Sequence, residues 1–362
     1  MMNKRNTEYL PDDLVVEILS RAPTKSLARF RSTSKGWNAL VKEERFSKKH
    51  SANASRQSLV IMLIDFRVYV VSVDLRAMQD NKVALTRQFT LEDPQSNSSE
   101  EVDICNVIHC DGLLLCTTED DRLVVWNPVS GETKWIQPRK SFHKNDVFAL
   151  GYDRKSSCYK IMRMDHFDDR FATAENELEI YDFTSNSRSV LSVTAFAFSI
   201  RRSQTRGVYV KGSTYWLAHD EALHKFLQSF DFSTETFQSR SSLPYPPDQY
   251  YSSCTLSVVR EDQICLLDVY SLDVWMSSKI ESNGFITWSK IRKAIANYKF
   301  SYGMSFVADE QHKVLVCYDK KNLHIVAEDR YIQVTDNGHG ENSSCAFVQS
   351  YVPTLVRIQQ GL

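Results

Sequence analysis

The hydrophobic pattern divides the chain into two parts. Between Leu10 and Val41, apolar residues recur every three or four positions, as they do along one side of a helix. From Ser58 to the end, they alternate with polar residues or form short apolar runs separated by turn residues, which is the pattern of β-strands. The pattern therefore predicts a mainly β protein with a small N-terminal α domain.

Three short helices are predicted in the N-terminal part. Pro11 suits the first position of a helix, because its missing N–H would have no partner there. Ala22-Pro23 ends this helix, and Thr24 and Ser34 are suitable N-caps for the next two. The apolar positions of the three helices are Leu14, Ile18 and Leu19, then Leu27 and Phe30, then Trp37, Leu40 and Val41. Such short helices bury too little surface to be stable alone, so their apolar stripe predicts a partner.

A two-hairpin pattern repeats through the β part. Asp111-Gly112 separates two apolar runs, which is a strong hairpin signal. The strands predicted at 123–126 and 133–136 flank a second turn that contains proline and glycine. The first hairpin recurs at turns near Asp153, Lys211, Glu261 and Asp309, in steps of 42, 58, 50 and 48 residues.

Repeats of this length are typical of β-propeller blades, each with four strands. An earlier unit is predicted from strands at 59–65, 68–73 and 83–89. The alternating tail from Tyr351 to Ile358 is predicted to complete this unit, which would close the ring and remove its free edges. Six blades are predicted, with a seventh blade or an irregular β-sandwich as the alternatives.

Composition limits the classes of function. The 362 residues allow two or three domains, and a net charge of -1 argues against a general nucleic-acid-binding protein. The N-terminus has no apolar signal segment, and no apolar run approaches the ~18 residues of a membrane helix. We therefore expect an intracellular protein of the nucleus or cytoplasm, without membrane association and with free cysteine thiols.

No catalytic or metal centre is predicted. Cys105, Cys110 and Cys116, with His109, do not have the close pairs that structural zinc sites use. His219 and His224 are five residues apart, rather than the four of a metalloprotease helix. The sequence also lacks a nucleophile elbow, a phosphate-binding loop and a dinucleotide fingerprint. We expect no catalytic residue, no metal and no cofactor.

Two connections between predicted strands are candidates for ligand contacts. Asp165–Arg170 is an acidic run, and we interpret it as a solvated loop. The segment 245–251 is rich in proline and tyrosine, and tyrosine is enriched at protein interfaces. Tyr245, Tyr250 and Tyr251 are therefore the candidate substrate-contact residues.

The helical part resembles the F-box, the motif by which a ubiquitin-ligase subunit docks onto a Skp-type adaptor. The matching residues are Leu10-Pro11, Leu14, Ile18-Leu19, Leu27, Phe30, Arg31-Ser32 and Lys35-Gly36-Trp37. Phe30 is larger than the valine or cysteine often found at its position. The resemblance implies an adaptor-binding site made of Leu10, Pro11, Leu14, Ile18, Leu19, Leu27, Phe30 and Trp37, with Trp37 mainly anchoring the helical core.

The β part resembles the F-box-associated, kelch-like domain of a large group of plant proteins. The matching segments are CDGLLLC (110–116), LVVWNPVSGETKWIQP (123–138), ALGYD (149–153), YKI (159–161) and EIYDF (179–183). The two resemblances imply an F-box at 8–50 and a propeller-like substrate-binding domain at 58–360.

Together they imply a non-catalytic substrate-recognition subunit of an SCF-type (Skp–cullin–F-box) ubiquitin ligase. The F-box would bind the Skp-type adaptor and, through it, a cullin scaffold, while the β domain would hold a protein substrate. Two alternatives stay open. The propeller could be an enzyme or a binding module for a small ligand or glycan, or the chain could retain an F-box without assembling into a ligase.

Overall fold

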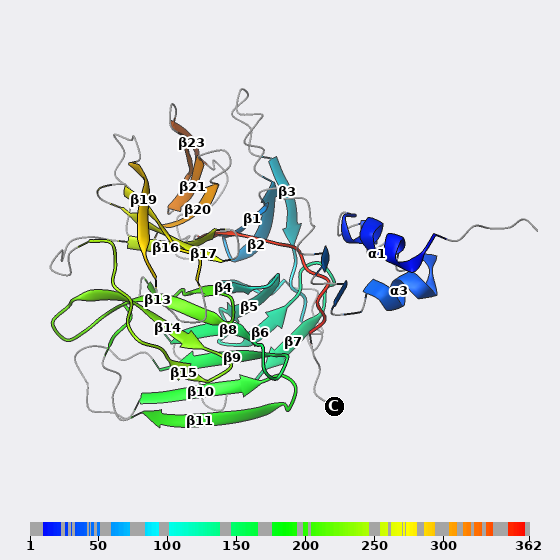
Figure 1. Ribbon diagram of the computed structural model, residues 1–362, viewed down its shortest axis with the longest axis horizontal. Helices are drawn as coiled ribbons and strands as arrows, with labels where there is room; N and C mark the ends of the chain where they lie inside the picture. Colours follow the sequence, from blue (N-terminus) through cyan, green and yellow to red (C-terminus); the bar gives the residue numbers. More distant parts are fainter. Residues whose placement is uncertain are drawn as a thin grey trace, which may run out of the picture.

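Among the described residues, the computed structural model contains two continuous helices and a ring of six β-sheets (Figure 1). It describes residues 10–22, 26–27, 30, 33–41, 43, 45–46, 49–50, 59–72, 84–93, 101–137, 146–165, 176–193, 198–201, 204–245, 254–259, 262–269, 271, 273–280, 286–293, 304–309, 314–319, 322–327, 331–335 and 347–358. The helices are α1 (Asp12–Ser20) and α3 (Lys35–Val41). Between them Ser26, Leu27 and Phe30 are also helical, and the rest of the predicted second helix lies outside the described residues.

Each sheet is a blade of four antiparallel strands. The first is β24 (Phe347–Ser350), β1 (Leu59–Ile64), β2 (Arg67–Ser72) and β3 (Ala84–Phe89), and the second is β4 (Ile104–Cys110), β5 (Leu113–Thr118), β6 (Leu123–Trp126) and β7 (Thr133–Ile136). The third is β8 (Val147–Asp153), β9 (Cys158–Met164), β10 (Asn176–Asp182) and β11 (Ser187–Val193), and the fourth is β12 (Val208–Val210), β13 (Ser213–His219), β14 (Lys225–Asp231) and β15 (Thr236–Phe237). The fifth is β16 (Cys254–Val259), β17 (Gln263–Asp268), β18 (Asp273–Ser277) and β19 (Trp288–Lys293), and the sixth is β20 (Ser305–Asp309), β21 (Val314–Asp319), β22 (Asn322–Val326) and β23 (Tyr331–Thr335). The predicted six-bladed propeller is confirmed.

The ring closes with an earlier segment than predicted. The closing strand is β24, which pairs with β1 from Leu63↔Phe347 to Val60↔Ser350. The last ladder hydrogen bond runs from the Tyr351 N–H to the Leu59 carbonyl, at 2.9 Å. The prediction that 351–358 forms this strand is therefore wrong. Pro353, which has no N–H, cannot continue the ladder, and the chain leaves the sheet.

Several hairpin turns share the same backbone conformation, in which the turn residues have positive φ. Asp111 and Lys211 have φ of 49° and 48°, and each is followed by a glycine, Gly112 at 83° and Gly212 at 97°. Such turns match the twist of antiparallel strands, and glycine adopts this conformation without strain. At other strand ends an aspartate accepts hydrogen bonds from the backbone N–H groups two and three residues later, as at Asp153, Asp182 and Asp231.

The core lies between neighbouring blades. One cluster joins Ile61 and Leu63 of the first blade to Leu114 and Val124 of the second, all at most 1% exposed. Gly151 in β8 shows how close this packing is, because a Cβ atom there would lie 2.1 Å from the Phe232 ring. Each four-stranded blade has two apolar faces, and it buries both of them by packing against the blades on either side.

The ring has two faces that the chain direction distinguishes. The strand of each blade that lies nearest the centre of the ring is β24, β4, β8, β12, β16 or β20, and we call these the inner strands. All six run in the same direction, so each starts at one face of the ring and ends at the other. We call these the start face and the end face. The β4–β5 turn at Gly112 and the β6–β7 turn around Val129 therefore both lie on the end face.

Candidate functional site

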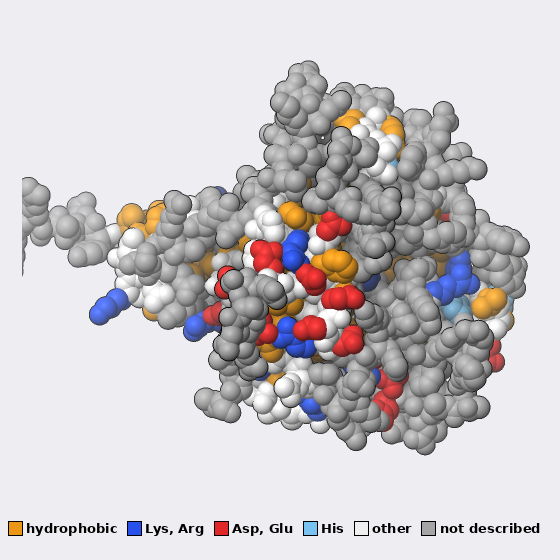
Figure 2. Space-filling model, turned by 180° about the vertical axis from the view of Figure 1, so that it is seen from behind, with side chains coloured by type: hydrophobic (Ala, Val, Ile, Leu, Met, Phe, Trp, Pro, Cys, Tyr) orange, Lys and Arg blue, Asp and Glu red, His pale blue; other side chains and the backbone are white. Residues whose placement is uncertain are grey.

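The first functional feature is an exposed apolar stripe on α1 and on the residue just before its N-cap. Leu10, Leu14 and Ile18 are 57%, 50% and 56% exposed, and they make up half of the large hydrophobic side chains that are exposed among the described residues. Leu14 and Ile18 are four positions apart on α1, so they lie on the same side of the helix. Figure 2 shows hydrophobic side chains at the surface of the helical end of the molecule. We call Leu10, Leu14 and Ile18 the α1 stripe.

The start of α1 follows the predicted signals. The Pro11 carbonyl accepts hydrogen bonds from the Leu14 and Val15 N–H groups, at 3.0 and 3.1 Å. Asp12 and Asp13 occupy the first turn, where the positive end of the helix dipole favours acidic groups. Pro11 itself is exposed beside the stripe. The sequence predicts Pro11 as the first helical residue, whereas in the structure Pro11 is the N-cap and α1 begins one residue later, at Asp12. The apolar stripe of the helix is turned outward.

The other predicted adaptor residues lie in or near the helical core. Leu19 and Leu27 are 4% and 0% exposed and pack with Val41 and Phe46. Phe30 and Trp37 are half-buried against this cluster, and their ring centroids are 5.6 Å apart in an edge-to-face arrangement. Leu19 and Leu27 thus shape the helical core and do not present a surface to a partner.

A strap formed by residues 351–358 connects the ring to the helices. Leu355, 5% exposed, lies in the helical core cluster together with Val129 of the β6–β7 turn. Asn127 Nδ2 donates to the carbonyls of Thr354 and Val356, at 3.3 and 2.7 Å. Figure 1 shows the strap in red running from the ring to the helices. The sequence pattern did not predict this role, because the alternation in 351–358 indicates a strand of a blade.

The strap is also held at its C-terminal end and near its middle. The side chain of Glu132 accepts from Arg357 Nε at 3.1 Å and from the Ile358 N–H at 3.0 Å. A Cβ atom on Gly112 would lie 2.6 Å from Thr354, so the β4–β5 turn touches the strap. Because Gly112 and Val129 lie on the end face, the helical domain is seated on the end face of the second blade.

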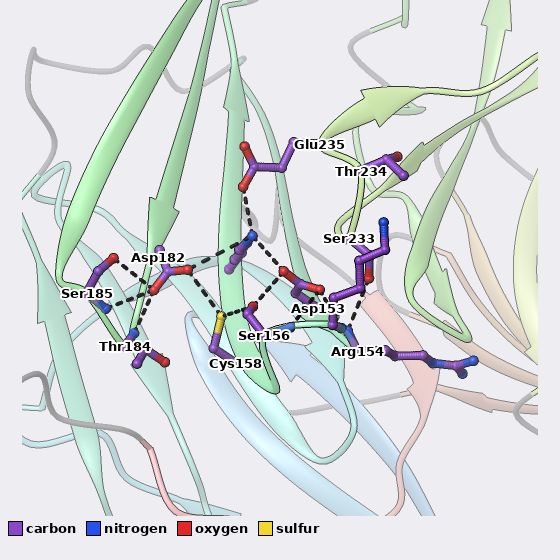
Figure 3. Close-up of polar contacts among 12 residues, drawn as sticks. Asp153, Arg154, Ser156, Cys158, Asp182, Thr184, Ser185, Ser233, Thr234 and Glu235 are labelled. Atoms are coloured by element: carbon purple, nitrogen blue, oxygen red, sulfur yellow. Dashed lines mark hydrogen bonds and ion pairs between the residues drawn. The ribbon is translucent and has the colours of Figure 1, made fainter.

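A buried charge cluster joins the third and fourth blades on the end face. Lys160, in β9, donates to Asp153 at 2.8 Å and to Glu235 at 2.7 Å, and lies 4.0 Å from Asp182. Figure 3 shows these carboxylates converging from three different turns. Burial opposes the charge of Lys160, but its bonds to Asp153 and Glu235 outweigh burial and raise the pKa of Lys160. A lysine held protonated in this way is a structural ion-pair partner and a poor nucleophile.

Cys110, Cys116, His109 and His219 occupy packing positions, whereas Cys105 is half-buried and the His224 side chain is 44% exposed. Cys110 and Cys116 are fully buried, and burial raises the pKa of both thiols. Burial lowers the pKa of His109 to about 4, and its Nε2 accepts the Gly112 N–H at 2.9 Å. His219 is a buried residue of β13. Within the described parts of the chain, no three metal-ligating side chains come together.

The predicted tyrosine contacts are only partly described. Tyr245 is half-buried, and its hydroxyl lies 2.9 Å from Cys254 Sγ at the start of β16. Tyr250 and Tyr251 lie outside the described residues, as do residues 166–170 of the acidic run. Asp165 forms an ion pair with Arg163, at 3.0 Å. None of the described helices is long and apolar enough to cross a membrane.

Comparisons with known proteins agree with this architecture. Residues 8–49 match the F-box domain, and residues 59–358 match the F-box associated beta propeller domain. The F-box protein At3g21130 of Arabidopsis thaliana is 51% identical, with all of both chains covered. The F-box/kelch-repeat protein At3g16740 of the same plant is 37% identical over 96% of this chain and 98% of its own. The chain therefore belongs to the F-box proteins that carry an F-box-associated β-propeller.

Proposed function

We propose that this chain is the substrate-recognition subunit of an SCF-type ubiquitin ligase. The α1 stripe binds a Skp-type adaptor, which in turn connects to a cullin scaffold, and the propeller binds a protein substrate. The observation that carries the proposal is the exposure of Leu10, Leu14 and Ile18 beside a helical core in which the other described large apolar side chains of this part are packed. Such an unpartnered apolar surface is typical of a protein-binding site.

In this role the chain accelerates ubiquitin transfer without bond chemistry of its own. It holds the substrate near the ubiquitin-charged enzyme, which raises the effective concentration of the reacting groups. The family of F-box proteins, to which the chain belongs, consists generally of adaptor subunits. The role also requires the chain to act inside the cell, in the nucleus or cytoplasm.

The test is co-purification of the full chain with a plant Skp-type adaptor. We expect the combined change Leu14→Asp and Ile18→Asp to reduce adaptor binding by at least a hundredfold, because charged side chains would replace the apolar contact. The matched control is Leu223→Asp, since Leu223 is 43% exposed but lies on the fourth blade.

The stripe variant must keep the circular dichroism and melting behaviour of the unchanged chain. Adaptor binding that survives the double change would refute the role of the stripe. If the unchanged chain itself does not bind the adaptor, it is a propeller that retains an F-box outside a ligase.

A further inference from the structure

A small cavity lies at the start-face end of the central channel. Its lining includes the first residues of four inner strands, namely Val208 of β12, Cys254 of β16, Ser305 of β20 and Phe347 of β24. The cavity has a volume of about 60 Å³. Because one water needs roughly 10–15 Å³ of such space, the cavity has room for the end of one polar side chain.

The described lining of the cavity contains one charged residue, an arginine. Of its described lining residues, Arg206 carries the only charge, and none is an aspartate or glutamate. Arg206 Nε donates to Asn106 Oδ1 at 2.6 Å, and the guanidinium lies 4.7 Å from the centre of the Phe347 ring. These two contacts hold the guanidinium plane in a fixed orientation at the cavity.

A buried hydroxyl in the same lining has no partner. Ser257 is 2% exposed, and its Oγ makes no hydrogen bond. An unpaired buried hydroxyl is unfavourable, and a ligand that accepts its hydrogen bond would remove that cost. A guanidinium and a hydroxyl in one cavity can together donate to a ligand that bears oxygen acceptors.

The position of the cavity suits substrate recognition. The strap and the helical domain occupy the end face, whereas the cavity lies at the start face of the ring. Cys254, which lines the cavity, is in contact with Tyr245 of the tyrosine-rich connection predicted to touch substrate. A substrate bound there would not compete with an adaptor bound to α1.

From this geometry we infer that the start-face cavity binds an aspartate or glutamate side chain of the substrate protein. The inference rests on the proposed function and names the chemistry that the propeller recognises. Arginine pairs with a planar carboxylate through two parallel hydrogen bonds. A phosphate group is usually bound by a cluster of arginines, and the described lining holds a single one, so a carboxylate fits the charge better.

The experiment measures peptide binding to the full chain by fluorescence anisotropy. The probes are acetylated nonapeptides with one central glutamate or aspartate between neutral residues, each paired with a glutamine or asparagine peptide, and inorganic phosphate as a competitor. We expect the acidic peptides to bind at least tenfold tighter than their neutral partners. Arg206→Gln should remove this preference, and Ser257→Ala should weaken acidic-peptide binding severalfold.

Arg240→Gln is the matched control, because Arg240 also lies over a phenylalanine ring, that of Phe226 at 4.3 Å, but outside the cavity lining. It should keep the full preference. If Arg206→Gln does not fold, Ser257→Thr keeps Arg206 and adds a methyl group to the cavity, and it should lower acidic-peptide affinity at least threefold.

Equal binding of acidic and neutral peptides would overturn the inference, as would a preference that Arg206→Gln retains or Arg240→Gln loses. Binding of phosphate without discrimination between the peptides would show an adventitious ion only, and would also overturn it. No adaptor is present in this assay. Its result is therefore independent of the co-purification result, and either proposal can fail without the other.

Discussion

At the scale of single residues, the cluster around Lys160 is a buried electrostatic feature of the ring. Asp153 is 3% exposed and Lys160 7% exposed, so neither charge is well solvated. Burial opposes ionisation of Asp153, but hydrogen bonds from Lys160 and Ser156 outweigh it and hold the pKa of Asp153 below its ordinary value of 3.8. Because the partners come from two blades, the cluster ties the third blade to the fourth.

Removing the positive charge of Lys160 should destabilise the folded protein. We expect Lys160→Met to lower the free energy of unfolding by about 3 kcal/mol, because a buried pair that loses one partner leaves uncompensated charge behind. Urea unfolding followed by tryptophan fluorescence measures this change. The control is Lys290→Met, whose 2.7 Å pair with Asp273 is 42% exposed on the lysine side and should cost under about 1 kcal/mol. Equal losses in the two variants would contradict a special role for the cluster.

The same variant has a pH signature. A carboxyl whose folded pKa is lowered contributes stability above its unfolded pKa, and this contribution disappears as the pH falls through the folded value. The difference between the unchanged chain and Lys160→Met should therefore be full at neutral pH and shrink below about pH 3.8, the ordinary pKa of Asp153. A difference that stays constant down to pH 2 would show that lost packing, and not lost charge, explains the effect.

At the scale of elements, the strap decides where the helices sit. Three kinds of contact hold the strap. Leu355 packs into the helical core, the Asn127 side chain donates hydrogen bonds to two strap carbonyls, and the Glu132 side chain accepts a hydrogen bond from the N–H at the strap's C-terminal end. The two helices are short, with nine residues in α1 and seven in α3. Their position relative to the ring therefore depends on a segment more than three hundred residues later in the chain.

Shortening Leu355 tests this dependence. We expect Leu355→Ala to destabilise the helical domain by about 2–4 kcal/mol, the usual range for a buried leucine truncated to alanine. Hydrogen exchange should speed up in α1 and α3 while the blades stay protected. Val352→Ala is the matched control, because Val352 is half-buried in the same strap and lies outside the helical core cluster. Unchanged exchange in both helices would show that the strap does not hold them.

At the scale of the whole molecule, closure of the ring makes the six blades one unit. β24, near the C-terminal end of the chain, pairs with β1, the first strand of the chain. Without it, β1 would present a free edge, and free edges promote association between chains. Val348 of β24, 1% exposed, also packs into the core between the first and sixth blades.

Two truncations separate ring closure from seating of the helices. A chain that ends at residue 346 lacks β24, and we expect it to aggregate or to elute as soluble oligomers in size-exclusion chromatography. A chain that ends at Ser350 keeps β24 but lacks the strap, so it should be monomeric and keep the blades protected while its helices exchange faster. Monomeric, cooperatively unfolding protein from the shorter chain would contradict the closing role of β24.

Sequence patterns determined the features that depend on local interactions. The turns at Asp111-Gly112 and 127–131, the strand pairs beside them and the start of α1 just after Pro11 follow from backbone preferences of a few neighbouring residues. The blade count followed as well, because the hairpin pattern repeats. The exposed α1 stripe was predicted from its spacing and from the resemblance to the F-box.

Only the tertiary structure decided which distant segments meet. The alternation in 351–358 resembles a strand, yet β24 takes the place beside β1 and leaves these residues to form the strap. Leu19 and Leu27 share the apolar character of Leu14 and Ile18, and only packing against Leu355 and Phe46 shows which of them are buried. The start-face cavity combines side chains from four blades. Local patterns carry no information on such contacts, because their partners lie far apart in the chain.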